Sequence, residues 1–183
     1  MQELMPVETA DDEEGGGGFS KFEKNEYSGR TQFAEVFASI NLGSGFTLLH
    51  GGDFRIGNMS NDYLSLSSFG PYTTSFKDTA MSQTSIYSSL LFSSTNKKLN
   101  IELGGRLNTH SRYGSNYTYT FNPSYNINNN YRIFGSIASG FKAPSLYQLY
   151  AGGGIGNANL LAEKSVNYEI GIQQKYKKVS NRI

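Results

Sequence analysis

Side chains of two kinds alternate one by one from Lys98 to His110, and this pattern constrains the fold more than any other feature of the chain. One set of positions is mainly apolar and the other mainly polar. The first set is Leu99, Ile101, Leu103, Gly105 and Leu107, and the second is Asn100, Glu102, Gly104, Arg106 and Asn108. Because successive side chains of a β-strand point to opposite faces, the pattern predicts a strand that separates an apolar from a polar environment.

The alternation returns in the segments 117–127, 131–137 and 166–172, and more weakly in 31–42, 46–56 and 82–92. Strands of about 10 residues are the length expected for tilted strands that cross a membrane, whereas soluble sandwiches favour somewhat shorter ones. Pro123 lacks a backbone N–H, so we expect it near a strand end or at a bulge. We find no convincing helical periodicity.

The connections between these strands alternate in length, which is a second sign of a membrane barrel. They are short at 43–45, long at 57–81, short at 93–97, medium at 111–116, short at 128–130 and long at 142–163. Outer-membrane barrels have tight turns on the periplasmic side and longer loops outside. We therefore predict an all-β fold of antiparallel transmembrane β-barrel strands over residues 31–183, preceded at residues 1–30 by a flexible external segment with the acidic and glycine-rich run 11–18.

Composition excludes several other classes of protein. No stretch approaches the roughly 20 apolar residues of a membrane helix. The net charge is +1 and the basic residues are scattered, so we expect no nucleic-acid partner. There is no Cys, which removes disulfides and Cys-rich metal sites. The first ten residues show no secretion signal, so either the protein stays inside the cell or the chain is a fragment of a longer protein.

The segment 139–150, Ser-Gly-Phe-Lys-Ala-Pro-Ser-Leu-Tyr-Gln-Leu-Tyr, resembles a signature of TonB-dependent outer-membrane receptors. It is followed by Gly-Asn-Ala-Asn-Leu-Leu-Ala-Glu-Lys-Ser at 156–165, similar to that family's Gly-Asn-Pro-x-Leu-x-Pro-Glu-x-Ser, and then by Tyr-Glu-Ile-Gly at 168–171. Ala158 and Ala162 stand where the family usually has proline, so this loop should be more mobile than usual. The resemblance implies about seven to eight strands of a larger barrel.

As implied by the resemblance, the protein lies in the bacterial outer membrane and takes up a scarce nutrient. Its partners would be outer-membrane lipid, a small-molecule nutrient (cobalamin or an iron–siderophore complex), and the energising protein TonB. The plug, the TonB-binding segment and the closing strand of the family are missing from this chain, so we interpret it as an internal part of the barrel. The segment 146–150 followed by Gly-Asn looks most like vitamin B12 receptors, with siderophore receptors close behind.

Two groups of candidate functional residues follow. The ligand-binding candidates lie in the two long loops and are Tyr63, Phe69, Tyr72, Tyr147, Gln148 and Tyr150. The alternative for these side chains is an aromatic girdle or packing within the loop. The lumen candidates, expected to face the plug, are Glu102, Arg106, Asn122, Arg132 and Glu169. Their alternative is that they are hydrated or paired with each other.

Other kinds of function remain open from the residues alone. An outer-membrane hydrolase would have to use His50 or His110, but no nucleophile motif supports it. A soluble carbohydrate-binding sandwich would bury the face that carries Leu103. Oxygen ligands for calcium are present at Asn58, Asn61, Asp62 and Asp78, although their spacing is not that of an EF-hand loop. We predict no catalytic residue, no metal site and no cofactor.

Overall fold

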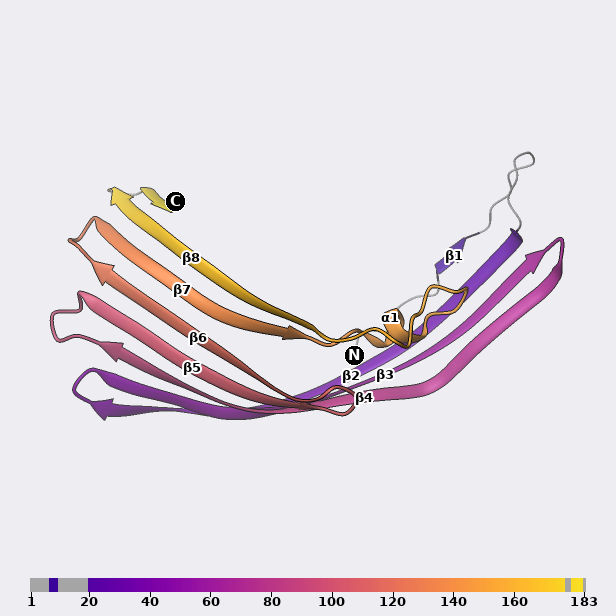
Figure 1. Cartoon of the computed structure of the whole chain (residues 1–183), viewed down its shortest axis with the longest axis horizontal. Coiled ribbons are helices and arrows are strands. Elements are labelled where there is room, and N and C mark those ends of the chain that lie inside the picture. Colours follow the sequence, from indigo (N-terminus) through magenta and orange to yellow (C-terminus); the bar gives the residue numbers. More distant parts are fainter. Residues whose placement is uncertain (1–6, 10–19, 177–178, 183) are drawn as a thin grey trace. The chain divides into compact units, whose positions relative to one another are not determined.

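The computed structural model describes residues 7–9, 20–176 and 179–182, and it is built almost entirely of β-strands (Figure 1). In chain order the elements are β1 (Val7–Thr9), β2 (Ser20–Gly43), β3 (Phe46–Ser67), β4 (Gly70–Ser93), β5 (Leu99–His110), β6 (Gly114–Asn126), β7 (Tyr131–Lys142), α1 (Leu146–Tyr150), β8 (Glu163–Tyr176) and β9 (Val179–Arg182). The strands form one sheet in the order of the sequence. The predicted all-β antiparallel fold is confirmed.

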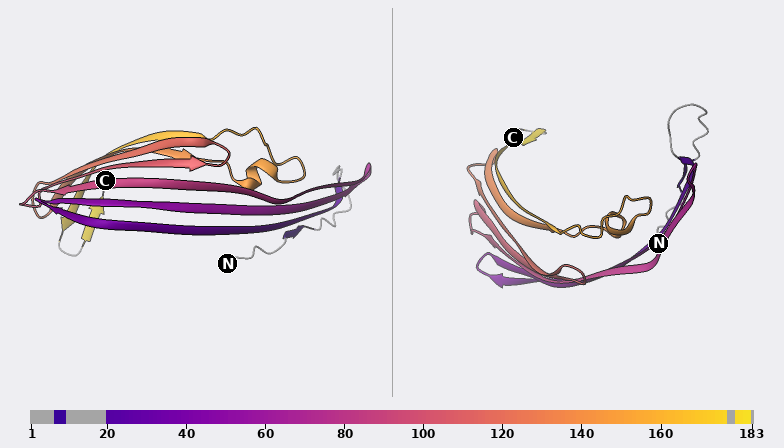
Figure 2. Two further views of the ribbon diagram at one scale, coloured as in Figure 1. Left: turned by 90° about the horizontal axis from the view of Figure 1, so that it is seen from below. Right: turned by 45° about the vertical axis from the view of Figure 1, so that its right-hand side comes forward.

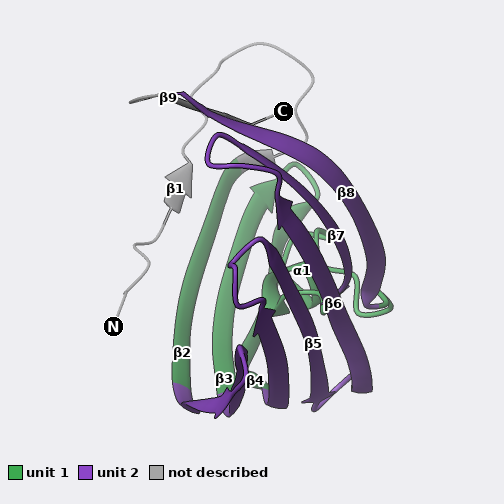
Figure 3. Cartoon of the chain, turned by 90° about the vertical axis from the view of Figure 1, so that its left-hand side faces the viewer, with its two compact units in different colours: residues 1–33, 55–82, 143–161 green, residues 34–54, 83–142, 162–183 purple. Residues whose placement is uncertain are grey.

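The chain divides into two compact units, which Figure 3 shows in different colours. Unit 1 consists of residues 1–33, 55–82 and 143–161, and unit 2 of residues 34–54, 83–142 and 162–183. Unit 1 thus holds the ends of β2, β3 and β4 together with α1. Unit 2 holds the rest of these strands and the meander β5 to β8, whose strands lie side by side in Figure 2.

The predicted long loop at 57–81 is wrong, because β3 and β4 continue through this segment as a long hairpin. Residues 20–30, predicted as part of a flexible opening, likewise belong to β2, whereas the run 11–18 lies outside the described residues. These segments lack the regular apolar alternation on which the strand predictions depend. A strand with polar surroundings on both sides needs no apolar face, so the sequence pattern does not reveal it.

The short turn predicted at 43–45 is present and depends on glycine. Gly43, Ser44 and Gly45 have φ of 81°, 52° and 84°, in the left-handed region that glycine adopts most easily. A Cβ on Gly45 would overlap the carbonyl oxygen of Ser93, whose N–H donates to the carbonyl of Gly45 over 2.8 Å. Any side chain at Gly45 would therefore push the two backbones apart.

The long connection predicted at 142–163 is also present, and it contains α1. The helix is only five residues long, too short to give a helical period in the sequence. Ser145 caps its start: the Ser145 side chain accepts from the Gln148 N–H, and the Gln148 side chain accepts from the Ser145 N–H.

Hydrophobic burial is confined to unit 1 among the side chains that the structure describes. The buried hydrophobic residues are Leu146, Leu149 and Ala151. In unit 2, by contrast, Leu103 is 57% exposed and Ile86 is 52% exposed. A soluble sandwich would cover these side chains, so the pattern favours a face in contact with lipid.

In the part of the chain that the structure describes, no helix has both the length and the apolar character needed to cross a membrane.

Candidate functional site

The strand registers of unit 2 place all five lumen candidates on one face of the meander. Glu102 lies opposite Asn122, Arg132 opposite Asn126, and Glu169 opposite Ser136. Arg106 is four residues from Glu102 and therefore shares its face. We call this side the polar face, and the opposite side, which carries Leu99, Leu103 and Leu107, the apolar face.

Arg106 is the centre of a polar cluster on this face. Its guanidinium forms an ion pair with Asp53, whose side chain is only 4% exposed. It also donates to Ser85 Oγ over 3.0 Å and to Asn108 Oδ1 over 2.8 Å. The guanidinium carbon lies 5.3 Å from the ring centre of Tyr87. The Arg106 charge is therefore paired and held in place.

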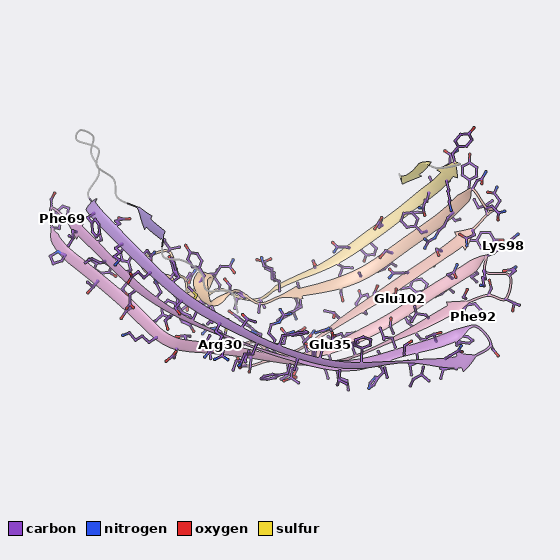
Figure 4. The ribbon with its side chains drawn as sticks, turned by 180° about the vertical axis from the view of Figure 1, so that it is seen from behind. Arg30, Glu35, Phe69, Phe92, Lys98 and Glu102 are labelled. Atoms are coloured by element: carbon purple, nitrogen blue, oxygen red, sulfur yellow. The ribbon has the colours of Figure 1, made fainter. Side chains whose placement is uncertain are left out.

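Tyr87 extends this cluster to strand β2, since its hydroxyl donates to Glu35 Oε1 over 2.7 Å. Glu35 is labelled in Figure 4. Sequence reasoning missed Asp53, Tyr87 and Glu35 as part of the site. Asp53 is 53 residues from Arg106, and no motif marks it. Only the register of the weakly patterned strands β2, β3 and β4 beside β5 brings these residues together.

A second chain of hydrogen bonds crosses β4, β5, β6 and β7 at Glu102, which Figure 4 also labels. Ser89 donates to Glu102 Oε1 over 2.8 Å, and Asn122 Nδ2 donates to Glu102 Oε2 over 3.1 Å. Ser136 in turn donates to Asn122 Oδ1 over 2.7 Å. The side chains of both predicted residues, Glu102 and Asn122, thus form hydrogen bonds to other strands of the same sheet.

Arg132 has a different environment. Its guanidinium carbon lies 5.9 Å from the ring centre of Phe134, two residues further along the same strand, and the residue is exposed. Glu169 is also exposed, on strand β8. These two charges are therefore more accessible from the polar face than Glu102 and Arg106 are.

Unit 1 contains the ligand-binding candidates and is organised around Asn61. This side chain is 1% exposed. Its Oδ1 accepts from the N–H of Gly152 over 2.8 Å, and its Nδ2 donates to Asn25 Oδ1 and to the carbonyl of Glu26. A Cβ on Gly152 would lie 2.6 Å from Cβ of Tyr63, so the loop backbone lies directly against β3. Asn61 is therefore a structural tether rather than a calcium ligand.

Most aromatic candidates form ring contacts in unit 1. Tyr63 and Tyr72 have ring centres 6.2 Å apart. Tyr147 lies 5.3 Å from Tyr27, and Tyr150 lies 5.7 Å from Phe76. Tyr72 and Tyr147 remain exposed, whereas Tyr63 and Tyr150 are half-buried.

The remaining two ligand-binding candidates are Phe69 and Gln148. Phe69 is 84% exposed at the tip of the β3–β4 hairpin, where Figure 4 labels it. The side chain of Gln148 caps α1, as its Oε1 accepts from the Ser145 N–H over 2.9 Å.

Burial, followed by the hydrogen bond and charge of Tyr147, raises the pKa of Tyr27 to about 12. Tyr27 is consequently a neutral hydrogen-bonding group at ordinary pH.

His50 does not form a hydrolytic site with the carboxylates of unit 2. His50 Nδ1 lies 2.6 Å from Ser88 Oγ, and Ser88 is on the apolar face opposite Gly105. Glu35, Asp53 and Glu102 are in the polar-face networks, so the sheet separates them from His50. Within the described ranges, no group of three His, Cys, Asp or Glu residues is placed to hold a metal ion.

A sequence model described as the β-barrel of TonB dependent receptor-like proteins matches residues 8–182. The ferric enterobactin receptor PirA of Pseudomonas aeruginosa is 37% identical over 89 residues, which cover 38% of this chain and 12% of the receptor. The vitamin B12 transporter BtuB of Photobacterium profundum is 37% identical over 67 residues, which cover 37% of this chain and 11% of the transporter. The matched parts are a small share of both relatives.

Solved structures with the same fold include the copper transporter OprC, with a TM-score of 0.67 and 13% identity over 87% of this chain and 29% of that one. The ferric yersiniabactin uptake receptor FyuA from Yersinia pestis has a TM-score of 0.65 and 17% identity over 91% of this chain and 29% of that one. At these identities the likeness concerns the fold alone.

Proposed function

The chain belongs to the TonB-dependent receptor-like β-barrel family of outer-membrane transport receptors, and from this premise we propose that it forms part of the wall of a receptor that takes up a ferric siderophore or cobalamin. The observation that carries the proposal is the family match over residues 8–182 together with a meander that has one polar and one apolar face. Transport by such a wall requires no covalent chemistry, and we infer that the chain is not an enzyme.

In this proposal unit 1 contacts the nutrient. The names of the two relatives give ferric enterobactin and vitamin B12 as their nutrients, and unit 1 presents several aromatic rings that could pack against ligands of this kind. Tyr72 and Tyr147 are exposed and supported by neighbouring rings, which keeps them available at little entropic cost. Gln148 caps the helix that carries Tyr147, so its role is to position this ring. Phe69 is an additional contact at the hairpin tip.

The polar face would surround the plug in the whole receptor, where TonB acts through a plug segment outside this chain. Arg132 and Glu169 are exposed charges on this face that can pair with a plug. Glu102, Arg106 and Asn122 would act differently. They are bonded to the wall itself and would keep the polar face rigid while the plug moves.

The uptake proposal is tested by Tyr147→Ala in the receptor that contains this chain, with radiolabelled ferric enterobactin and cyanocobalamin as the two probes. Loss of a well-packed aromatic contact is typically worth about 1–2 kcal/mol or more, so the KM for one probe should rise roughly tenfold with the maximal rate unchanged. Tyr168→Ala is the control, since this ring is 76% exposed on the apolar face.

Two results would contradict the proposal. Equal KM values for Tyr147→Ala and wild type would remove α1 from the binding site. If cells with the wild-type receptor took up neither probe, the nutrient classes named in the proposal would be wrong.

A further inference from the structure

The apolar face of unit 2 contains a hollow of about 500 Å³ between strands β5 and β8. Its size falls in the range of roughly 300–1,000 Å³ that small-molecule sites occupy. Its surface is mainly apolar, although Ser124, Phe134, Ser136 and Glu169 of the polar face also border it. On the apolar face the lining residues are Leu99, Phe121, Pro123, Tyr125, Ile133, Gly135, Ile137, Tyr168 and Ile170.

The strand registers explain why a hollow forms at this place. Three rows of residues cross the apolar face of β5 to β8. The two outer rows are Leu99, Tyr125, Ile133 and Ile172, and Leu103, Phe121, Ile137 and Tyr168. The row between them is Ile101, Pro123, Gly135 and Ile170. Large side chains thus flank a centre made of a proline ring and a glycine.

The backbone at this centre is also irregular. Pairing between β6 and β7 runs through Thr120 and Phe121 and resumes at Ser124, so it skips Asn122 and Pro123. Proline has no N–H to donate to the ladder. Pro123 lies three residues before the end of β6, so the expectation that it lies near a strand end agrees with the structure, and the pairing with β7 is interrupted there.

The end of the meander nearest the hollow carries positive charge. Leu99 lines the hollow and directly follows the turn that contains Lys97 and Lys98, both exposed. Figure 4 shows Lys98 at this end of the strands. The residues of this turn and of the turn at 127–130 include no carboxylate. Short turns are on the periplasmic side of outer-membrane barrels, where the leaflet consists of phospholipid.

We propose that the hollow binds one acyl chain of an anionic phospholipid of the periplasmic leaflet, with its headgroup phosphate held by Lys97 and Lys98. The apolar lining matches the hydrocarbon chain, and the two ammonium groups match the phosphate at the membrane surface. Phe121, Tyr125 and Tyr168 border the chain with flat ring surfaces. This site is independent of nutrient uptake, because it lies on the opposite face of the sheet from the polar networks.

The test fills the hollow. A Cβ on Gly135 would lie 3.5 Å from the carbonyl oxygen of Glu169 and 3.8 Å from Cγ of Pro123, which are ordinary contacts, so Gly135→Leu is compatible with the fold. Gly105→Leu is the matched control. It adds the same side chain to the apolar face outside the hollow, where the three atoms nearest to the new Cβ belong to the movable ring of Tyr117.

The receptor that contains this chain is reconstituted in phosphatidylethanolamine vesicles with added phosphatidylglycerol that carries a photoreactive group in its acyl chain. Cross-links are then mapped by mass spectrometry. In the wild type they should concentrate on peptides from β6 and β7 around the hollow. The leucine side chain of Gly135→Leu should displace about two methylene groups of the bound acyl chain from the hollow, which corresponds to roughly tenfold less cross-linking at β6 and β7. Gly105→Leu should leave this cross-linking unchanged.

The headgroup is tested with the double variant Lys97→Asn and Lys98→Gln. Asn is chosen because Lys97 has φ of 54°, which Asn tolerates. Each lysine near the surface is worth roughly fivefold in binding an anionic headgroup, so the preference for phosphatidylglycerol over phosphatidylethanolamine should fall by at least that factor.

Several outcomes would overturn the proposal. One is cross-linking spread evenly over the apolar face, and another is an equal loss in Gly135→Leu and Gly105→Leu. Cross-links to a second protein copy at β6 and β7 would show that the hollow is a protein interface instead. Each variant is first checked for the heat-modifiable gel mobility of a folded barrel, and normal nutrient uptake in Gly135→Leu would separate this site from the proposed function.

Discussion

Asp53 is more dependent on Arg106 than Arg106 is on Asp53, because their surroundings differ. The Asp53 side chain is 4% exposed and the Arg106 side chain is 36% exposed. If the arginine is removed, a buried carboxylate is left without its cation. If the carboxylate is removed, the guanidinium still donates to Ser85 and Asn108 and can reach water.

Arg106→Ala should therefore destabilise the receptor by about 3 kcal/mol, the low end for a broken buried pair, because the arginine is partly hydrated. Asp53→Asn should cost only about 1–2 kcal/mol, since it leaves a polar side chain at the same place. The measurement is the urea concentration at which the folded, heat-modifiable gel band is lost. Arg132→Ala is the control and should change stability by less than about 0.5 kcal/mol. A larger loss for Asp53→Asn than for Arg106→Ala would contradict this view of the pair.

The sequence pattern predicted the strands of the meander β5 to β8 well and the strands over residues 57–81 poorly. The surroundings of the two faces of each strand explain the difference. Predicted strands at 98–110 and 131–137 match β5 (Leu99–His110) and the first part of β7 (Tyr131–Lys142). These strands separate two environments, so their side chains must alternate. Residues 57–81 have no such constraint, and their strands were missed. The pairing of Asp53 with Arg106 was missed for another reason, because it depends on register rather than on composition.

At the level of the element, the hydrogen bond from the Gly152 N–H to Asn61 Oδ1 ties the connection between β7 and β8 to β3. Asn61→Ala would leave the N–H of Gly152 without its acceptor and would also remove the bonds to β2. Losing a buried hydrogen-bond partner costs about 1–3 kcal/mol. We therefore expect amide hydrogen exchange in 146–157 to accelerate by roughly ten- to a hundredfold, with exchange in β5 and β6 unchanged.

The control for this prediction is Asp62→Ala. Asp62 is the next residue of the same strand and is exposed. The Asp62→Ala variant should leave amide hydrogen exchange in residues 146–157 at the wild-type rate. Faster exchange throughout β5 to β8 in Asn61→Ala would show that Asn61 stabilises the whole sheet and not the connection alone.

At the level of the whole molecule, the described sheet has two nearly unpaired edges. β1 pairs with only three residues of β2, at 23–25, and β9 pairs with only four residues of β8, at 173–176. The described β2 continues to Gly43, and β8 begins at Glu163, so along one side of each strand most backbone N–H and C=O groups pair with no other described strand. In lipid each unpaired group costs several kcal/mol, and only closed barrels avoid this cost.

The 183-residue chain made alone should consequently form no pore. Strands shaped for the wall of a plugged barrel of about 22 strands have a curvature and stagger suited to that wide ring. Closing them into a small barrel would force Arg106, Arg132 and Glu169 into a lumen just wide enough for side chains, where their hydration is lost. Association through the open edges of β2 and β8 is then the favoured outcome. Refolding the chain in detergent, followed by measurement of conductance, heat-modifiable gel mobility and particle size, tests this. A compact, monodisperse, conducting species would show that these strands close by themselves, and the interpretation of the chain as part of a larger wall would have to be abandoned.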